Sequence, residues 1–224
     1  AVTMENMIHH TQAVMRGCKT ALVVGDMPFM SYNTSIREAI ANAGRLMKEG
    51  GCDVVKLEGG TTFAPTVEAI VKAGIPVQGH IGLTPQTASA LGGFKMQGKD
   101  ASAAKQIIDD AQALEAAGAF SIILEAVPAP LGKLVAAAVK VPVIGIGAGP
   151  DVDGQVLVTH DMVGLFDKFV PKFVKQYTKI RPGILDALKA YKQEVLEVTV
   201  PAAEHSFKMP DETLKQLKKM VGRS

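Results

Sequence analysis

The sequence contains no tryptophan and only two cysteines, Cys18 and Cys52. Two cysteines exclude a disulfide scaffold and suit a reducing compartment, so we expect a cytoplasmic protein. Aromatic residues make up 5% of the chain, which is too few for a platform that stacks single-stranded nucleic acid. No apolar run approaches the roughly 20 residues that span a bilayer, and residues 1–6 do not form a signal peptide.

Neither sign of charge is in excess. The chain has 24 Lys and Arg against 22 Asp and Glu, a formal net charge of +2. This balance predicts neither a nucleic-acid partner nor an anionic membrane as a partner. Hydrophobic residues make up 47% and charged residues 21%, as in an average soluble globular chain. A chain of this composition can bury enough apolar surface to offset its ordering entropy, which excludes a disordered protein.

Short β-branched runs alternate with longer helical patterns along the chain. Near-continuous apolar runs are typical of strands that are covered on both faces. Six runs predict such strands: residues 21–26 (ALVVGD), 53–58 (DVVKLE), 76–81 (PVQGHI), 120–127 (FSIILEAV), 142–147 (PVIGIG) and 156–161 (VLVTHD). The segments between and after them predict helices over residues 3–16, 65–73, 101–117, 130–139, 168–177, 182–198 and 211–220. A further helix starts at a capping box, with Ser35 as the N-cap and Glu38 reaching back.

This alternation predicts an α/β fold with a parallel sheet, either doubly wound or closed into a barrel. No dinucleotide glycine fingerprint follows the first strand, which weakens the doubly wound reading. A (β/α)₈ TIM barrel needs eight strands and about 250 residues. We therefore predict a (β/α)₈ barrel that lacks its N-terminal strands 1 and 2 in this chain, with the barrel domain over residues 1–207 and a helical tail over 208–224. The alternative is a complete open sheet of six strands.

Charged side chains stand where the predicted strands end. In a parallel barrel the C-terminal strand ends face the active site, and a charge there must be solvated, paired or bound to metal. The residues at these ends are Asp26, Lys56 with Glu58, His80, Glu125, and His160 with Asp161. Together these residues predict a functional site, which none of them would indicate alone.

For each of these residues a purely structural role is the alternative to a functional one. Asp26 offers carboxylate oxygens to Mg²⁺ but could equally form a turn. Lys56 and Glu58 lie two apart and share one face of a strand, either as functional groups or as a structural ion pair. His80 could orient a carbonyl, relay a proton or bind metal, or be a satisfied buried histidine. Glu125 ends a very apolar strand, which suits a general base, but it could simply pair with a cation.

Two connections are rich in glycine. Residues 84–100 form a long connection of the kind that serves as a lid or binding loop, and Thr84 with Pro85 predicts the start of a helix within it. The run 145–149 (GIGAG) is similar to a phosphate-binding loop, although tight strand packing followed by a turn is the reading we favour.

Several segments together resemble the ketopantoate hydroxymethyltransferase family. They are residues 26–32 (DMPFMSY), 55–60 (VKLEGG), 79–86 (GHIGLTPQ), 92–95 (GGFK), 124–128 (LEAVP), 142–149 (PVIGIGAG) and 204–207 (EHSF). The ordered match runs from about Thr3 to Phe207, and the segment 79–86 is its most specific piece. The resemblance implies a (β/α)₈ barrel, a homodecamer, and Mg²⁺-dependent transfer of a hydroxymethyl group from 5,10-methylenetetrahydrofolate to 3-methyl-2-oxobutanoate, giving 2-dehydropantoate on the route to pantothenate and coenzyme A.

The resemblance also implies a role for each matched residue. Asp26 is similar to a metal ligand that also lies against the substrate, and Glu58 to the second carboxylate of the metal site. Lys56 and His80 are similar to substrate contacts, and Glu125 to the proton acceptor. The family has a Gly-Asp-Ser motif, with a metal ligand and a substrate contact, at the end of its second strand. This chain begins after that motif, so the expected metal site lacks one ligand.

The resemblance predicts a mechanism in which Mg²⁺ stabilises the enolate that forms when Glu125 removes the C3 proton of the substrate. Lys56 would neutralise the substrate carboxylate or the enolate oxygen. Two alternatives stay open. One is another Mg²⁺-enolate barrel of the phosphoenolpyruvate mutase or isocitrate lyase type, which would need no folate. The other is an inactive barrel fragment that acts only in assembly.

Overall fold

The computed structural model describes residues 2–90 and 92–222, which form two compact units. The first unit holds residues 2–157 together with Pro171–Val174, and the second holds Val158–Val170 and residues 175–222. The predicted barrel domain over residues 1–207 and tail over 208–224 stay predictions. Among the described residues, no helix is both long enough and apolar enough to cross a membrane.

The first unit is built on a parallel sheet of six strands. They are β1 (Val24–Asp26), β2 (Val54–Glu58), β3 (Val77–Gly82), β4 (Ser121–Glu125), β5 (Val143–Ile146) and β6 (Gly154–Gln155). Their order in the sheet follows their order in the chain. A doubly wound sheet reverses its strand order at a switch point, whereas a barrel does not. The predicted α/β class is therefore confirmed, and the strand order is that of a barrel wall.

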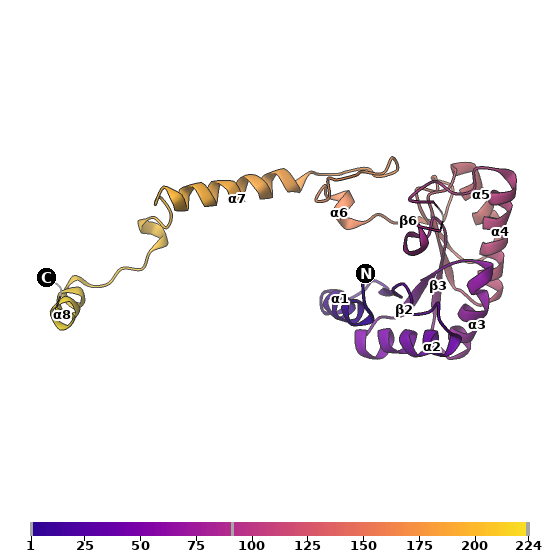
Figure 1. The fold of residues 1–224 in the computed structure, drawn as a ribbon, viewed down its shortest axis with the longest axis horizontal. Helices are drawn as coiled ribbons and strands as arrows, with labels where there is room; N and C mark the ends of the chain where they lie inside the picture. Colours follow the sequence, from indigo (N-terminus) through magenta and orange to yellow (C-terminus); the bar gives the residue numbers. More distant parts are fainter. Residues whose placement is uncertain (1, 91, 223–224) are drawn as a thin grey trace. The chain divides into compact units, whose positions relative to one another are not determined.

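Five helices accompany this sheet. They are α1 (Met4–Gly17), α2 (Ile36–Arg45), α3 (Ala64–Lys72), α4 (Ala101–Ala116) and α5 (Ala129–Ala138). The helices α3, α4 and α5 lie along one face of the sheet (Figure 1). Ser35 caps α2 as predicted, because its hydroxyl accepts a hydrogen bond from the Glu38 backbone N–H at 3.2 Å. The predicted return bond is wrong: the Glu38 carboxylate accepts from the Thr34 hydroxyl instead.

The two faces of the sheet differ in chemistry. Val55, Leu57 and Leu124 belong to the buried core that the sheet shares with the helices. At Gly79 a methyl group would lie 2.6 Å from Leu114 Cδ1, so glycine lets α4 pack close to β3. Side chains alternate along a strand, and the opposite face therefore receives Lys56 between those two apolar residues. This alternation was predicted from the spacing in β2.

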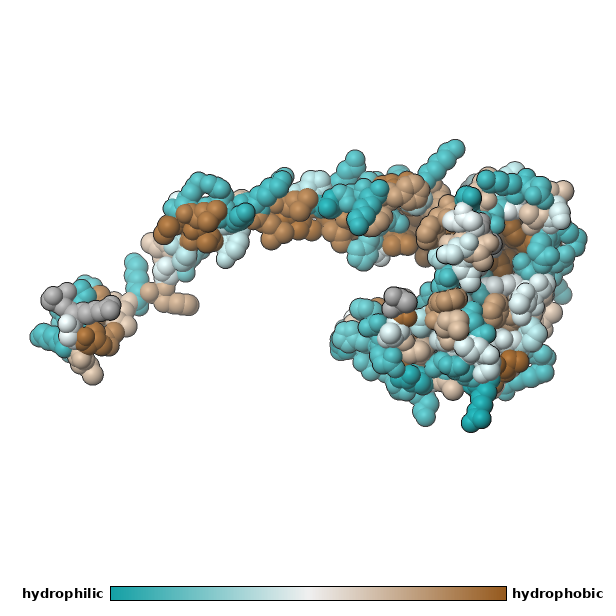
Figure 2. Space-filling model, in the orientation of Figure 1, coloured by the Kyte–Doolittle hydropathy of each residue, from teal (hydrophilic) through white to brown (hydrophobic). Residues whose placement is uncertain are grey.

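The second unit contains α6 (Thr159–Met162), α7 (Ile180–Leu196) and α8 (Asp211–Met220). The helix predicted over residues 211–220 is confirmed, and α7 begins two residues before its predicted start at 182. Apolar side chains gather along one side of α7 in Figure 2. Four apolar residues recur at helical spacing along α7 and are all exposed: Ile184, Leu188, Tyr191 and Val195.

Two predicted elements are wrong. The predicted strand over 156–161 does not form: β6 ends at Gln155 after pairing with Ile144 and Gly145, and α6 follows at Thr159. The alternating valines of that segment favour a strand, but pairing with β5 extends only to Gln155, opposite Gly145. The predicted helix over 168–177 is also absent, because Pro171 has no N–H for a helical hydrogen bond at its interior.

Candidate functional site

The parallel register brings five titratable residues to one edge of the sheet. Asp26 is the partner of Lys56 across β1 and β2, and Glu58 is the partner of His80 across β2 and β3. Glu125 at the end of β4 is the partner of Gly82. Partners in register point to the same face, so all five side chains share the face opposite the helices. The structure brings these five residues together at the strand ends as predicted, but not His160 and Asp161.

Lys56 lies between an acid and an imidazole. Its Nζ is 2.7 Å from Asp26 Oδ1 and 3.3 Å from His80 Nδ1. The Lys56 side chain is 15% exposed, whereas that of Asp26 is 40% exposed. The ammonium is therefore held inside the site, while the Asp26 carboxylate also reaches solvent and is open to a ligand.

His80 connects two glutamates. Its Nδ1 is 3.6 Å from Glu58 Oε1, and its Nε2 is 3.2 Å from Glu125 Oε2. His80 and Glu58 are buried, and the Glu125 side chain is 15% exposed. Burial raises the pKa of Glu58 because water no longer solvates its charge, and the nearby His80 and Lys56 act against this rise. The site thus brings three carboxyl groups together with one ammonium and one imidazole.

Sequence reasoning missed two residues that hold Glu58. The Gln86 backbone N–H donates to Glu58 Oε2 at 3.0 Å, and the Gln86 side chain donates to the Met27 carbonyl at 2.9 Å. The Tyr32 hydroxyl donates to Gln86 Oε1 at 2.9 Å and accepts from the Glu58 backbone N–H at 3.3 Å. Both residues follow strands of the sheet and end two of the segments that carry the family resemblance, 26–32 and 79–86, which are the signals that could have pointed to them.

The backbone next to Glu125 is strained. Ala126 has φ of 51°, a left-handed conformation that a residue with a side chain adopts at some cost. Its N–H donates to the Ile146 carbonyl at 2.8 Å, and its carbonyl accepts from the Gln97 N–H at 2.9 Å. These bonds hold the strained turn, and with it the course of the backbone just after Glu125.

Two of the residues at this edge, Asp26 and Glu58, offer carboxylate oxygens to a hard cation such as Mg²⁺. Among residues 2–90 and 92–222, no three His, Cys, Asp or Glu side chains are arranged to hold a metal ion. Asp26 and Glu58 nevertheless supply carboxylates from the ends of adjacent strands. Mg²⁺ commonly binds through one or two carboxylates and completes its octahedron with water and substrate oxygens. The chemistry of these two residues therefore fits such an ion.

Three further predictions have different outcomes. His160 and Asp161 lie in α6, within the second unit, and not at the end of a strand of the sheet. In the connection 84–100, Thr84 and Pro85 start only a single 3₁₀ turn, Pro85–Thr87. The glycine run 145–149 packs tightly, as we favoured: a methyl group at Gly145 would lie 2.8 Å from Val152 Cγ2.

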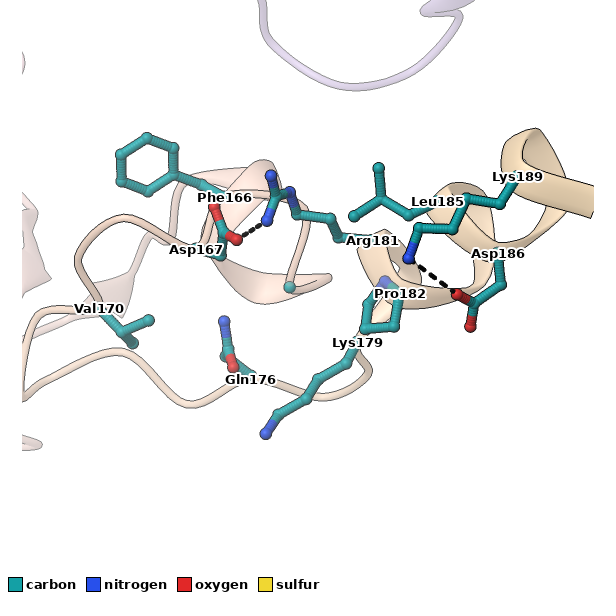
Figure 3. Close-up of a pocket in the computed structure, with 11 residues that line it drawn as sticks. Phe166, Asp167, Val170, Gln176, Lys179, Arg181, Pro182, Leu185, Asp186 and Lys189 are labelled. Carbon is teal, nitrogen blue, oxygen red and sulfur yellow. Dashed lines mark ion pairs between the residues drawn. The ribbon is translucent and has the colours of Figure 1, made fainter. Parts of the chain in front are cut away.

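A pocket of about 340 Å³ lies within the second unit (Figure 3). An ion pair between Arg181 and Asp167 lies at it, and Lys189 Nζ is 3.8 Å from Asp186 Oδ1. None of the residues predicted for the site lines this pocket. The exposed pair Lys189 and Asp186 is of the kind that contributes little to stability.

The chain matches one known protein family over most of its length. The family model described as ketopantoate hydroxymethyltransferase matches residues 1–203. A protein of Heliobacterium modesticaldum named 3-methyl-2-oxobutanoate hydroxymethyltransferase is 58% identical over 94% of this chain and 76% of its own length. A protein of the same name from Syntrophobacter fumaroxidans is 57% identical over 97% of this chain and 77% of its own length. The chain thus spans about three quarters of these relatives.

The fold has a counterpart among solved structures. A crystal structure of phosphonopyruvate hydrolase superposes with a TM-score of 0.54 and 12% sequence identity. The superposition covers 99% of this chain and 77% of the hydrolase. At this identity the likeness concerns the fold alone.

Proposed function

We propose, because the chain belongs to the ketopantoate hydroxymethyltransferase family, that it transfers a hydroxymethyl group from 5,10-methylenetetrahydrofolate to 3-methyl-2-oxobutanoate, giving 2-dehydropantoate. The observation that carries this proposal is the cluster of Asp26, Lys56, Glu58, His80 and Glu125 on one face and one edge of the sheet. It combines carboxylates for a cation, an ammonium for an anionic substrate, and a shielded base.

The sheet is, in this proposal, part of a (β/α)₈ barrel. Three features support it: the strands follow in chain order, helices α3, α4 and α5 lie along one face, and the functional side chains occupy the other. Barrel enzymes place their active sites at the C-terminal ends of the strands. The five residues occupy that position here.

Asp26 and Glu58 would hold Mg²⁺. Their carboxylate oxygens are the ligands that this ion prefers, and the exposed side of Asp26 leaves room for a substrate. Once bound, Mg²⁺ would act as a Lewis acid toward the oxygens of a 2-oxo acid. Lys56 would supply positive charge beside Asp26, where the substrate carboxylate or a developing enolate oxygen is neutralised.

Glu125 is the base in this proposal. Its carboxylate takes the proton from C3 of the 2-oxo acid, and the electron pair of that C–H bond forms the enolate. The enolate carbon then forms a carbon–carbon bond with the methylene carbon of the folate, and both bonds from that carbon to folate nitrogens break. A water molecule supplies the hydroxyl oxygen of the product. Its remaining proton and the proton held by Glu125 go to the two nitrogens, which releases tetrahydrofolate. His80, at 3.2 Å from Glu125 Oε2, orients the carboxylate, and the low exposure of Glu125 keeps water from competing as the proton acceptor.

The one-carbon donor needs space beside Glu125. A cavity of about 410 Å³ at the end of β5 is lined by Gly147, Gly149 and Phe173, together with Pro150 and Gln155. Ile146, the residue before this glycine turn, is the register partner of Glu125. A cavity that begins one residue beyond this register pair supports a reaction with two substrates.

Assembly into a homo-oligomer, a decamer by resemblance, also belongs to the proposal. The stripe of Ile184, Leu188, Tyr191 and Val195 on α7 supports it, because exposed apolar residues at helical spacing favour burial against another surface. Light scattering coupled to gel filtration measures the subunit number, and a monomer at working concentration would contradict this part.

Product formation tests the proposed reaction directly. The protein is mixed with 3-methyl-2-oxobutanoate, Mg²⁺ and 5,10-methylenetetrahydrofolate, and 2-dehydropantoate is measured by mass spectrometry. We expect product only when all three are present. No product from the complete mixture would refute the transfer, and turnover of the 2-oxo acid without folate would favour the other Mg²⁺-enolate barrels.

A further inference from the structure

A closed ring of hydrogen bonds surrounds Glu58. The Glu58 backbone N–H donates to the Tyr32 hydroxyl, and that hydroxyl donates to Gln86 Oε1. The backbone N–H of the same glutamine donates to Glu58 Oε2. We propose that Tyr32 and Gln86 are positioning residues that set the orientation of the Glu58 carboxylate for a divalent cation. This inference rests on the proposed function, in which Glu58 is one of the two metal carboxylates.

The ring distinguishes the two oxygens of Glu58. Oε2 accepts the 3.0 Å bond from Gln86, whereas Oε1 faces His80 Nδ1 at 3.6 Å. The first oxygen is therefore committed to a protein donor, and the second has only a long contact. A carboxylate fixed in this way presents one defined oxygen to a ligand.

Gln86 is held in place by its own side chain. Its amide N–H₂ donates to the Met27 carbonyl at 2.9 Å, and its amide oxygen accepts from Tyr32 at 2.9 Å. Met27 directly follows Asp26, so one glutamine connects the segments that follow β1, β2 and β3. Gln86 thus binds the Glu58 carboxylate through its backbone N–H, and its side chain binds the residue that follows Asp26.

Tyr32 is suited to a fixed donor role. The residue is fully buried, and its ring lies edge to face with Phe63 at a centroid distance of 5.4 Å. Its hydroxyl accepts from the Glu58 backbone N–H at 3.3 Å and donates to Gln86 Oε1 at 2.9 Å, so both partners fix its direction.

Two variants separate positioning from packing. Tyr32→Phe removes the hydroxyl and keeps the ring against Phe63, whereas Gln86→Leu removes the amide and keeps the backbone N–H. Gln78→Leu is the matched control, because this glutamine lies on the same face of the sheet and donates to Ser121 Oγ at 2.9 Å. Tyr32→Phe and Gln86→Leu each lose two hydrogen bonds and Gln78→Leu loses one, so the control should show the smaller fall in melting temperature.

The readout is binding of Mn²⁺ alone, titrated by electron paramagnetic resonance without substrate. Loss of a group that orients a metal ligand typically weakens binding about 10- to 100-fold. We expect at least a tenfold weaker dissociation constant for Tyr32→Phe and Gln86→Leu, and the parent value for Gln78→Leu.

The opposing results are distinguishable. If the parent binds Mn²⁺ and both ring variants bind it equally well, Tyr32 and Gln86 do not position Glu58. If the control loses as much affinity as they do, the effect is general loosening, and the inference fails. A parent that binds no Mn²⁺ refutes the metal assignment of the proposed function, and this inference with it.

Discussion

Replacing Glu125 by glutamine removes the proposed base with little change of shape. The Glu125 Oε2 atom lies 3.2 Å from His80 Nε2, and the side chain is 15% exposed. The amide oxygen of glutamine can take the same place opposite the imidazole. The variant should therefore fold like the parent, with a free energy of unfolding within about 1–2 kcal/mol. What it cannot do is accept a proton.

The expected loss of rate follows from this position. A positioned general base contributes about 10²- to 10⁴-fold, or roughly 3–5 kcal/mol of the activation free energy. Glu125 is mostly shielded from water, so solvent cannot readily replace it as the proton acceptor. We therefore expect proton abstraction to slow by about 10³-fold or more.

The assay is proton NMR of 3-methyl-2-oxobutanoate in D₂O with Mg²⁺, which follows loss of the C3 proton signal without folate. Glu115→Gln is the matched control: Glu115 Oε1 accepts from the backbone N–H groups of Lys140 and Val141, just before β5 at the opposite end of the sheet. The control should exchange at the parent rate. Exchange at that rate by the Glu125 variant would show that another group removes the proton.

Three further predictions concern binding and stability. Lys56→Met should raise the KM for 3-methyl-2-oxobutanoate about 10- to 100-fold, because a charge-assisted bond is lost; steady-state kinetics that leave KM unchanged would count against Lys56 as the carboxylate partner. Gly82→Ala should destabilise the protein by about 3 kcal/mol or more in urea unfolding, since φ is 88° and the new methyl group would lie 2.3 Å from the Glu125 carbonyl oxygen. Gly74→Ala, at φ of 85° with open space around it, isolates the backbone strain and should cost only about 1 kcal/mol; equal losses would contradict the clash. Because the pKa of Glu58 is raised, Glu58 holds its proton more tightly in the folded state than in the unfolded state. The contribution of Glu58 to the free energy of unfolding therefore falls as the pH rises above 4.5. Glu58→Gln should therefore gain stability relative to the parent at pH 7 and lose that advantage below about pH 4; an advantage independent of pH would refute this reasoning.

Much of the fold can be predicted from local pattern. The alternation of apolar strands with helical stripes is enough to predict a parallel α/β sheet, and the period of two in β2 predicts that Lys56 and Glu58 share a face. Helix starts follow from capping residues, as at Ser35. Charges at strand ends predict the edge at which the site lies, because burial of such charges needs a reason.

Local sequence pattern fails to predict secondary structure where a neighbouring element decides whether a strand or helix forms. The valines of residues 156–161 predict a strand, yet the pairing between β5 and β6 ends at Gln155, opposite Gly145. Thr84 and Pro85 read as a helix start, yet only one turn forms. A strand or helix of this length depends on neighbours that its own residues do not specify.

Within the site, the sequence by itself determined which chemical groups stand at the strand ends, since the spacing of two along each strand is a local property. Tertiary structure alone decided which of them meet. The contacts of Lys56 with Asp26, and of His80 with Glu58 and Glu125, join residues from separate strands through the sheet register. The ring of Tyr32 and Gln86 joins residues 54 positions apart. No local periodicity encodes such pairs, because they form only when separate loops are brought to the same edge of the folded sheet.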